Sequence, residues 1–216
     1  MKKFAVVLSG CGVFDGSEIH EATLSLLAIA RNGCSYEMFA PDRNQHHVIN
    51  HLTGEEMDET RNVLVESARI ARGKIRDLKE FDPIAFDGLL FPGGFGAAKN
   101  LSTWAFEAAD ASVLPEVEDA IRGMVALKKP VGALCISPVL LARVLGEVKL
   151  TIGDDEGTME ALESTGATHI ITTHGEVVLD PEYNVVTTPC YMLDATIDQI
   201  ALGANNVVDA MIKLME

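Results

Sequence analysis

No apolar run in the chain reaches the roughly 18 residues that a membrane-spanning helix requires. Basic residues are also scarce, with 17 Lys and Arg against 32 Asp and Glu and a formal net charge of −15. Nucleic acids and anionic membranes both bind positive protein surface. We therefore expect neither a nucleic-acid partner nor a membrane partner.

Cysteines are few and widely separated. The four of them form no CxxC pair and have no metal-ligand spacing: Cys11, Cys34, Cys135 and Cys190. The start "MKKFAVVLSG" has an apolar stretch of only about six residues, shorter than the ~7–15 of a secretory signal core, and it is more typical of a first strand. We therefore expect free thiols and a cytoplasmic location.

What the chain does have is the composition of a folded globular domain. Its 216 residues are 48% hydrophobic and 23% charged, which is enough to bury a large core in one domain. The β-branched run "FAVVLSG" predicts a buried strand, "SEIHEATLSLLAIARNG" predicts a helix and "SYEMFAP" a second strand. Asp15 followed by Glu18 indicates a capping box at the start of that helix.

The same alternation continues along the chain. We expect a helix from about Glu59 to Arg72, then the strand "FDGLLF", the helix "PEVEDAIRGMVALKKP", the strand "VGALC" and the helix "SPVLLARVLG". Two strands around a turn at Asp180-Pro181 and a helix from about Ala195 to Met215 complete the pattern. Alternating strands and helices predict an α/β three-layer sandwich with a mostly parallel sheet. Sites in such folds lie outside the carboxyl ends of the strands.

Cys135 stands at one of these strand ends. It separates the strand "VGAL" from the helix "SPVLLARVLG", in which Pro138 suits the first turn. This order predicts a nucleophile elbow that presents the thiol in a cleft, where the helix N-terminus lowers the thiol pKa. The alternative is a buried, inert core cysteine.

The glycine loop "PGGFG" follows another strand end. Its spacing matches neither of the usual nucleotide-binding glycine motifs. A better use is an oxyanion hole, in which the N–H of Gly93 or Gly94 and that of Ile136 face a developing negative oxygen. A plain tight turn is the alternative.

Two glutamates begin the first predicted helix. Glu18 and Glu21 lie three residues apart, on neighbouring rows of the helix surface. A carboxyl group held against a thiol in a water-poor cleft has a raised pKa and can move protons. The favourable interaction of acidic residues with a helix N-terminus also accounts for glutamates there.

Histidines offer weaker candidates. In "HHVINH" no carboxylate or cysteine completes a metal set with His46, His47 and His51, so we interpret the segment as a solvated loop and expect no metal. His174, two residues before Glu176, is a possible partner for a cysteine, with a surface histidine as the default.

Cys11, at the end of the first strand, is a possible rival nucleophile. Flanking glycines permit that role, but no helix N-terminus follows it directly.

Several segments closely resemble one known family: "SGCGVFDGSEIHEA", "NHLTGE", "ETRNVLVESARIARG", "PGGFGAAKNLS" and "VVTTPCYM". It is the glyoxalase-like isoprenoid-biosynthesis family, also called enhancing-lycopene-biosynthesis or sigma cross-reacting proteins. Its superfamily includes the Parkinson-disease-associated deglycase, intracellular proteases and class I glutamine amidotransferases. The resemblance covers essentially the whole chain. It implies one flavodoxin-like, class I glutamine amidotransferase-like domain over residues 1–216, commonly a homodimer.

The resemblance also implies roles for residues. Cys135 matches the elbow cysteine, Glu21 the glutamate paired with it, Glu18 a second acidic position, and Gly93 and Gly94 the oxyanion-hole loop. Where protease-type members have histidine directly after the cysteine, this chain has isoleucine, which argues against peptidase activity. "ALCISPV" also lacks the second glycine and the glutamine that surround the cysteine of amidotransferases.

From these residues and this resemblance we expect a cofactor-independent glyoxalase. It would convert a small dicarbonyl such as glyoxal into a 2-hydroxy acid such as glycolate, through a hemithioacetal on Cys135. Protein or nucleotide deglycation would be the same activity on another substrate. The alternatives are an amidase- or glutaminase-type subunit that uses Cys135 and His174, and a non-enzymatic protein whose elbow thiol senses oxidants.

Overall fold

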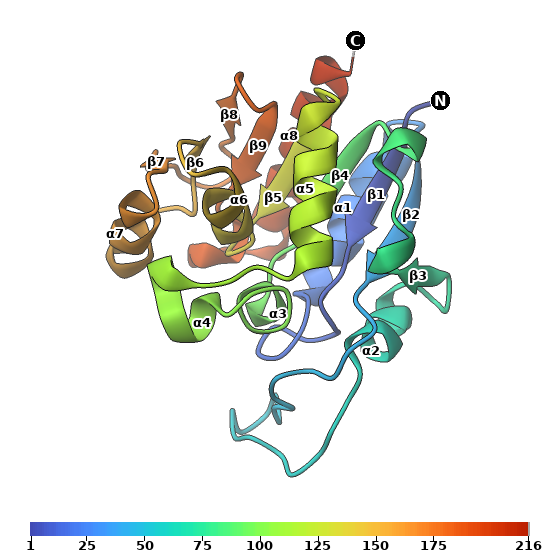
Figure 1. The fold of residues 1–216 in the computed structure, drawn as a ribbon, viewed down its shortest axis with the longest axis vertical. Coiled ribbons are helices and arrows are strands. Elements are labelled where there is room, and N and C mark those ends of the chain that lie inside the picture. The colour runs from blue at the N-terminus through green and yellow to red at the C-terminus, as the bar shows by residue number, and fades with distance from the viewer. Residues whose placement is uncertain (216) are drawn as a thin grey trace.

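The computed structural model describes residues 1–215, in which strands and helices alternate as the sequence predicts (Figure 1). The strands are β1 (Lys3–Val7), β2 (Ser35–Ala40), β3 (Ile75–Asp77), β4 (Gly88–Phe91), β5 (Val131–Leu134), β6 (Lys149–Leu150), β7 (Thr168–His169), β8 (Val178–Asp180) and β9 (Val185–Thr188). The helices are α1 (Ile19–Arg31), α2 (Val63–Ile70), α3 (Phe95–Lys99), α4 (Trp104–Glu107), α5 (Pro115–Ala126), α6 (Pro138–Leu145), α7 (Glu156–Ser164) and α8 (Ile197–Leu214). None of these helices is long and apolar enough to cross a membrane.

Seven strands form one sheet in the order β3-β2-β1-β4-β5-β9-β8. Every neighbouring pair is parallel except β8 and β9, which form the antiparallel hairpin expected around Asp180. The short strands β6 and β7 pair separately. This mostly parallel sheet confirms the predicted α/β, flavodoxin-like architecture.

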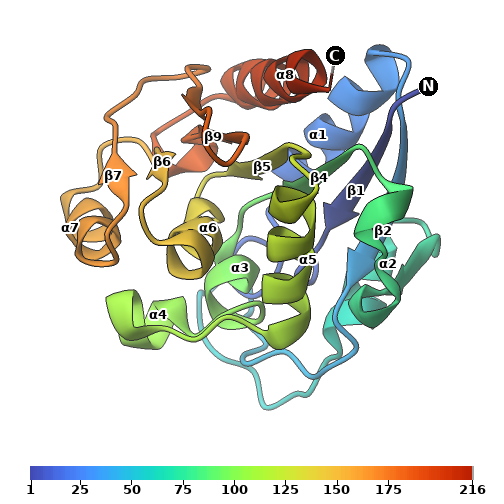
Figure 2. The same ribbon diagram turned by 45° about the horizontal axis from the view of Figure 1, so that its top comes forward.

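The sheet is covered on both faces, and the alternation along β1 shows how. Phe4 and Val6 join the core that α1 and α8 cover, whereas Ala5 and Val7 join the core that α5 and α6 cover. Figure 2 shows these two pairs of helices on opposite sides of the sheet. A central strand buried on both faces must be apolar throughout, which explains the unbroken run "FAVV".

Two helix starts differ from the predictions. The residue that caps α1 is Glu18, whose carboxylate accepts the Glu21 N–H at 2.7 Å. Asp15 instead accepts the N–H of Ile49 at 2.8 Å and so holds the loop after β2. The predicted helix from Glu59 begins only at Val63, because Asn62 caps it and the preceding residue pairs through its backbone with Gln45.

The helix α8 runs from Ile197 to Leu214, slightly shorter than the predicted Ala195 to Met215. Thr196 and Gln199 form a capping box that sets its first turn.

The helix α8 also packs against the sheet so closely that one strand position admits no side chain. A Cβ on Gly132 of β5 would lie 2.5 Å from Leu90 Cδ1 and 2.5 Å from Met211 Sδ. We predict that Gly132→Ala lowers the free energy of unfolding by about 1–3 kcal/mol, measured by urea denaturation. The control is Gly157→Ala in α7, where the nearest atom would be 4.0 Å away. This control should keep or slightly raise stability, and equal losses in both variants would contradict the packing argument.

Candidate functional site

The carboxyl ends of four adjacent strands bring the candidate residues together. The strands β1, β4, β5 and β9 are neighbours in the sheet. The segments that follow them are residues 8–18, 92–94, 135–137 and 189–192. A backbone hydrogen bond from the Glu18 N–H to the Gly93 carbonyl joins the first two segments, and a second one joins the Gly96 N–H of α3 to the Gly16 carbonyl, each 2.9 Å. The convergence expected from the strand-end rule is therefore present.

Cys135 lies on a strained turn directly after β5. Its φ of +60° is left-handed, a conformation that costs a non-glycine residue about 1 kcal/mol or more. Its N–H donates to the Thr188 carbonyl of β9 at 3.0 Å, and the neighbouring Ser137 hydroxyl donates to the Pro92 carbonyl at 2.7 Å. Since α6 begins three residues later at Pro138, this turn is the predicted elbow.

Glu21 is fully buried against that elbow. Its Oε2 accepts the Gly93 N–H at 2.8 Å, its Oε1 accepts the Tyr191 N–H at 3.2 Å, and its carboxyl group hydrogen-bonds with the Cys135 thiol. A Cβ placed on Gly93 would lie 2.5 Å from Glu21 Oε2 and 2.9 Å from Cys135 Sγ. Glycine at this position therefore leaves the space in which carboxyl and thiol meet.

Burial sets the proton affinity of both groups. Burial and, second, the negative charge of Glu18 raise the pKa of Glu21 to about 8. Burial and, second, the negative charge of Glu21 raise the pKa of the Cys135 thiol well above its usual value. The predicted lowering of the thiol pKa by the helix N-terminus is therefore wrong, because desolvation outweighs the nearby N–H donors. At neutral pH both groups hold their protons.

The structure shows where the N–H groups of the predicted oxyanion donors point. The Gly93 N–H is occupied by Glu21, so it is not free to bind a developing oxyanion. The N–H groups of Gly94 and Ile136 donate to the Cys135 sulfur and lower the pKa of its thiol. Both N–H groups therefore lie beside the sulfur, and their role as donors to an oxyanion stays a prediction.

Glu18 affects the site through its charge and through its capping of α1. Its carboxylate is engaged as the cap of α1, and its Oε1 lies 4.0 Å from His20 Nδ1. Its charge raises the pKa of Glu21. The structure therefore places it as a neighbour of the carboxyl–thiol pair.

Tyr191 is a site residue that the sequence reasoning missed. It lies in the short turn Cys190–Met192 after β9, and His20 Nδ1 lies 2.8 Å from its hydroxyl. Burial and, second, the charge of Glu18 raise the pKa of its phenol. The available signal was "VVTTPCYM", a strand run followed by Cys and Tyr at one more strand end.

A cavity of about 350 Å³ opens over the Cys135 thiol. Its walls come from four segments of the chain and from α7. The lining residues are Val13, Gly94, Phe95, Cys135, Ile136, Asp155, Thr158, Tyr191 and Met192.

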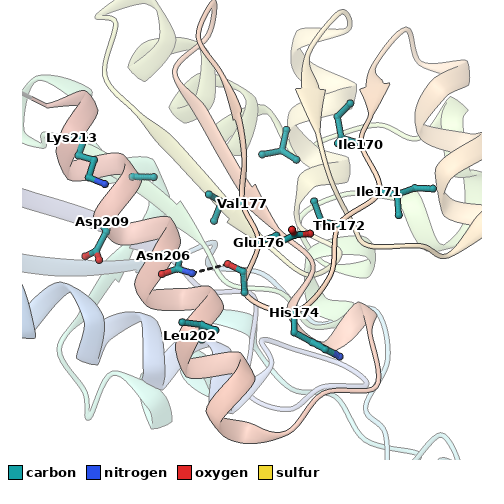
Figure 3. A pocket seen from close by; sticks show the side chains of 13 residues that line it. Ile170, Ile171, Thr172, His174, Glu176, Val177, Leu202, Asn206, Asp209 and Lys213 are labelled. Atoms are coloured by element: carbon teal, nitrogen blue, oxygen red, sulfur yellow. Dashed lines mark hydrogen bonds between the residues drawn. The ribbon is translucent and has the colours of Figure 1, made fainter.

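His174 does not share this cavity. It lines a separate groove of about 720 Å³ between α8 and residues 170–178, together with Leu202, Asn206 and Glu176 (Figure 3). The two cavities have no lining residue in common. The structure therefore does not bring His174 to Cys135, and the alternative in which the two residues pair finds no support.

Cys11 also lies apart from the cavity. It is half-buried, and burial and, second, the charge of Glu66 raise the pKa of its thiol. All four cysteines are free.

The histidines of the polar loop make aromatic contacts. His46 packs against Phe106, with ring centres 4.2 Å apart, and His51 Nε2 accepts the Phe14 N–H at 3.2 Å. Within residues 1–215 no three His, Cys, Asp or Glu side chains gather in an arrangement that could hold a metal ion.

The sheet order and the strand–cysteine–helix elbow define an α/β protein of the amidotransferase-like class. No protein-family model matches the chain. A rat protein named ES1 protein homolog is 44% identical over 222 residues, covering 98% of this chain and 84% of its own length. A human protein named glutamine amidotransferase-like class 1 domain-containing protein 3 is likewise 44% identical, covering 98% of this chain and 83% of its own. The chain therefore belongs to the ES1 family of amidotransferase-like proteins.

Solved structures agree with this assignment. The crystal structure of an isoprenoid biosynthesis protein with amidotransferase-like domain from Ehrlichia chaffeensis has a TM-score of 0.94 and 36% identity, and the match covers 100% of both chains. Drosophila DJ-1beta, with a TM-score of 0.55 and 15% identity over 99% of this chain and 95% of its own, shares the fold. The resemblance stated from the sequence is confirmed.

The expected cytoplasmic location is contradicted by the relatives. Those from rat, human and zebrafish are all named as mitochondrial proteins. The expectation rested on the pattern of the first residues, which does not distinguish among the compartments of a cell.

The raised pKa of Glu21 makes a prediction for stability. The folded protein keeps this proton up to a pH of about 8, whereas the unfolded chain loses it near 4.5. Stability from this group is therefore present at low pH and lost as pH rises through that window, at ~1.4 kcal/mol per pKa unit. We predict that Glu21→Gln flattens the fall in Tm between pH 5 and pH 9.

The control for this prediction is Glu160→Gln on the exposed surface of α7. It should keep the wild-type slope. A wild-type slope in Glu21→Gln as well would contradict the raised pKa.

Proposed function

We propose that the protein is a cofactor-independent glyoxalase that converts glyoxal, or a related α-oxoaldehyde, into a 2-hydroxy acid. The observation that carries this proposal is the contact of the Cys135 thiol with the buried carboxyl of Glu21, beneath an open cavity. A nucleophile needs a base within hydrogen-bond reach, and here that base is a carboxylate.

The first step joins sulfur to substrate. Glu21, as carboxylate, takes the thiol proton as the sulfur attacks one aldehyde carbon. It then gives that proton to the alkoxide oxygen, so that a hemithioacetal forms and Glu21 is again a carboxylate. The N–H groups of Gly94 and Ile136 stabilise the negative oxygen while it exists. Because the base touches the thiol, the high thiol pKa does not prevent attack.

The second step moves a hydrogen between adjacent carbons. Glu21 removes the proton from the carbon that bears sulfur, which gives an enediol, and returns a proton to the neighbouring carbon. The product is a thioester of glycolate, and water hydrolyses it to glycolate and the free thiol. Tyr191 lines the cavity, and His20 orients its hydroxyl group. In this proposal that hydroxyl donates a hydrogen bond to the second substrate oxygen.

The rival activities lack a comparable observation. An amidase or glutaminase needs a histidine beside the thiol, and His174 lines another groove. A redox sensor needs an accessible, low-pKa thiol, whereas Cys135 is 7% exposed and its pKa is raised. Deglycation starts from carbonyl adducts and would use the same steps. The homodimer expected from the family resemblance stays a prediction, for light scattering to test.

Removal of the nucleophile is the direct test. We predict that Cys135→Ala abolishes glycolate formation from glyoxal, measured by chromatography of the products. Cys34→Ala, at a half-buried thiol after α1, is the matched control and should retain wild-type turnover. Glycolate production by Cys135→Ala at the wild-type rate would rule the proposal out.

The ionisation of Glu21 should determine how kcat/KM changes with pH. Because Glu21 must be ionised to accept a proton, kcat/KM for glyoxal should rise as pH increases through about 8. Glu21→Gln should lose this rise and roughly 10²–10⁴ of the rate. Glu21→Asp, which keeps a carboxylate, should retain a rise with pH. A profile with no step near that pH would contradict the role of Glu21.

A further inference from the structure

The cavity above Cys135 is larger than glyoxal needs. Its volume of about 350 Å³ corresponds to roughly a dozen water molecules at ~30 Å³ each. Glyoxal has only two carbons and two oxygens, so it would fill a small part of this space. The remaining volume can hold a substituent on the reacting carbonyl group.

Most of the cavity wall is apolar. Val13, Phe95, Ile136 and Met192 line it, together with Tyr191. Phe95 is 46% exposed, so its ring is available at the cavity to pack against a ligand. A wall of this kind favours an aliphatic or aromatic substituent.

One residue gives the cavity its charge. Among the described residues that line it, Asp155 is the single charged side chain. Its carboxylate caps α7 by accepting the Thr158 N–H at 2.9 Å, and hydrogen bonds from Thr158 lower its pKa. The neighbouring side chains Asp154 and Glu156 are also exposed and acidic.

No lysine, arginine or histidine lines the cavity to neutralise this charge. Lys99 lies 5.1 Å from the centre of the Phe95 ring, but its ammonium donates to the Phe14 carbonyl at 3.0 Å and does not line the cavity. The His20 side chain is not among the lining residues either: its Nδ1 lies 2.8 Å from the Tyr191 hydroxyl and 4.0 Å from Glu18 Oε1. Asp155 is therefore the one carboxylate of the described lining, in addition to the Glu21 carboxyl buried beneath the thiol, and no lining residue neutralises it.

We propose that the Cys135 cavity selects α-oxoaldehydes with an apolar substituent that is neutral or cationic, and rejects anionic ones, with Asp155 as the residue that determines this selection. The substrate class rests on the proposed glyoxalase function; the charge selection at the thiol does not. Carbonyl compounds that carry phosphate or carboxylate, including nucleotide adducts, would be poor substrates because they would bring a second negative charge beside Asp155.

Thiol-modifying reagents of different charge test the selection without any need for turnover. Methanethiosulfonates with a trimethylammonium-ethyl, a methyl or a sulfonate-ethyl group each transfer their thio group to a cysteine. The thiolate attacks the sulfenyl sulfur, a disulfide forms and methanesulfinate leaves. The rate at Cys135 is followed by mass spectrometry of its peptide, and each charged reagent's rate is divided by that of the neutral one.

The matched variants are Asp155→Asn and Asp119→Asn. Asparagine caps a helix as well as aspartate does, so Asp155→Asn should change the charge and keep the start of α7. Asp119 is exposed on α5, and its replacement alters the net charge of the protein by the same unit. Asp119→Asn therefore controls for the effect of the protein's overall negative charge on the rates of charged reagents.

In the wild type the cationic reagent should react faster at Cys135 than the anionic one. Asp155→Asn should reduce this cation-to-anion ratio by roughly three- to tenfold, the effect of one exposed charge that lines the same cavity. Asp119→Asn should leave the ratio as it is. A wild-type ratio near one, or the same ratio in Asp155→Asn as in the wild type, would overturn the proposal.

Turnover separates this inference from the proposed function. Phenylglyoxals with a para-trimethylammonium or a para-carboxylate group should follow the same order in kcat/KM, and Asp155→Asn should narrow the difference. If the reagents discriminate but no 2-hydroxy acid forms, the glyoxalase function fails and the charge selection stands. If glycolate forms but neither reagents nor substrates discriminate by charge, the selection fails and the glyoxalase function stands.

Discussion

The hydrogen bond from the Gly93 N–H to the Glu21 carboxyl is the interaction on which the site depends. A fully buried carboxyl group is costly unless its oxygens are hydrogen-bonded. Here the donors come from the loop after β4 and from the turn after β9, and the thiol comes from the elbow after β5. One side chain of α1 therefore ties three strand ends together, so the position of α1 fixes the geometry around the sulfur.

A backbone hydrogen bond also links α1 to the glycine loop, with the donor on the side of α1. The Gly93 carbonyl accepts the Glu18 N–H at 2.9 Å, so the first turn of α1 and the glycine loop each donate to the other. Glu18 then caps the helix and at the same time adds negative charge near Glu21. Structural capping and the tuning of the Glu21 pKa are thus two effects of one carboxylate. This explains why the two glutamates occur one helical turn apart.

Local patterns in the sequence predicted most of the fold and the centre of the site. Apolar runs located the strands, and the strand–cysteine–helix order located the elbow at Cys135. Properties that depend on convergence of distant segments were not predictable. Three such properties depend on how the loops fold. The Gly93 N–H donates to Glu21, burial raises the pKa of Cys135, and Tyr191 and Asp155 line the cavity. Even the cap of α1 is Glu18 and not the Asp15 that the sequence indicates. Only the folded loop shows that the Asp15 carboxylate accepts the Ile49 N–H instead.

The chemistry follows from the fact that the thiol faces a carboxyl group and not a histidine. A histidine whose pKa exceeds that of the thiol takes the thiol proton and leaves a thiolate–imidazolium ion pair at neutral pH, which suits attack on stable bonds such as amides. In this site burial raises the pKa of the Glu21 carboxyl to about 8 and raises the pKa of the Cys135 thiol as well, so thiol and carboxyl form one coupled pair for proton exchange. Such a pair suits a reactive aldehyde, for which attack is easy and the difficult step is moving a proton between carbons. The arrangement of Cys135, Glu21 and the two N–H groups beside the sulfur therefore supports the proposed isomerisation of a dicarbonyl over hydrolysis of a peptide or glutamine amide.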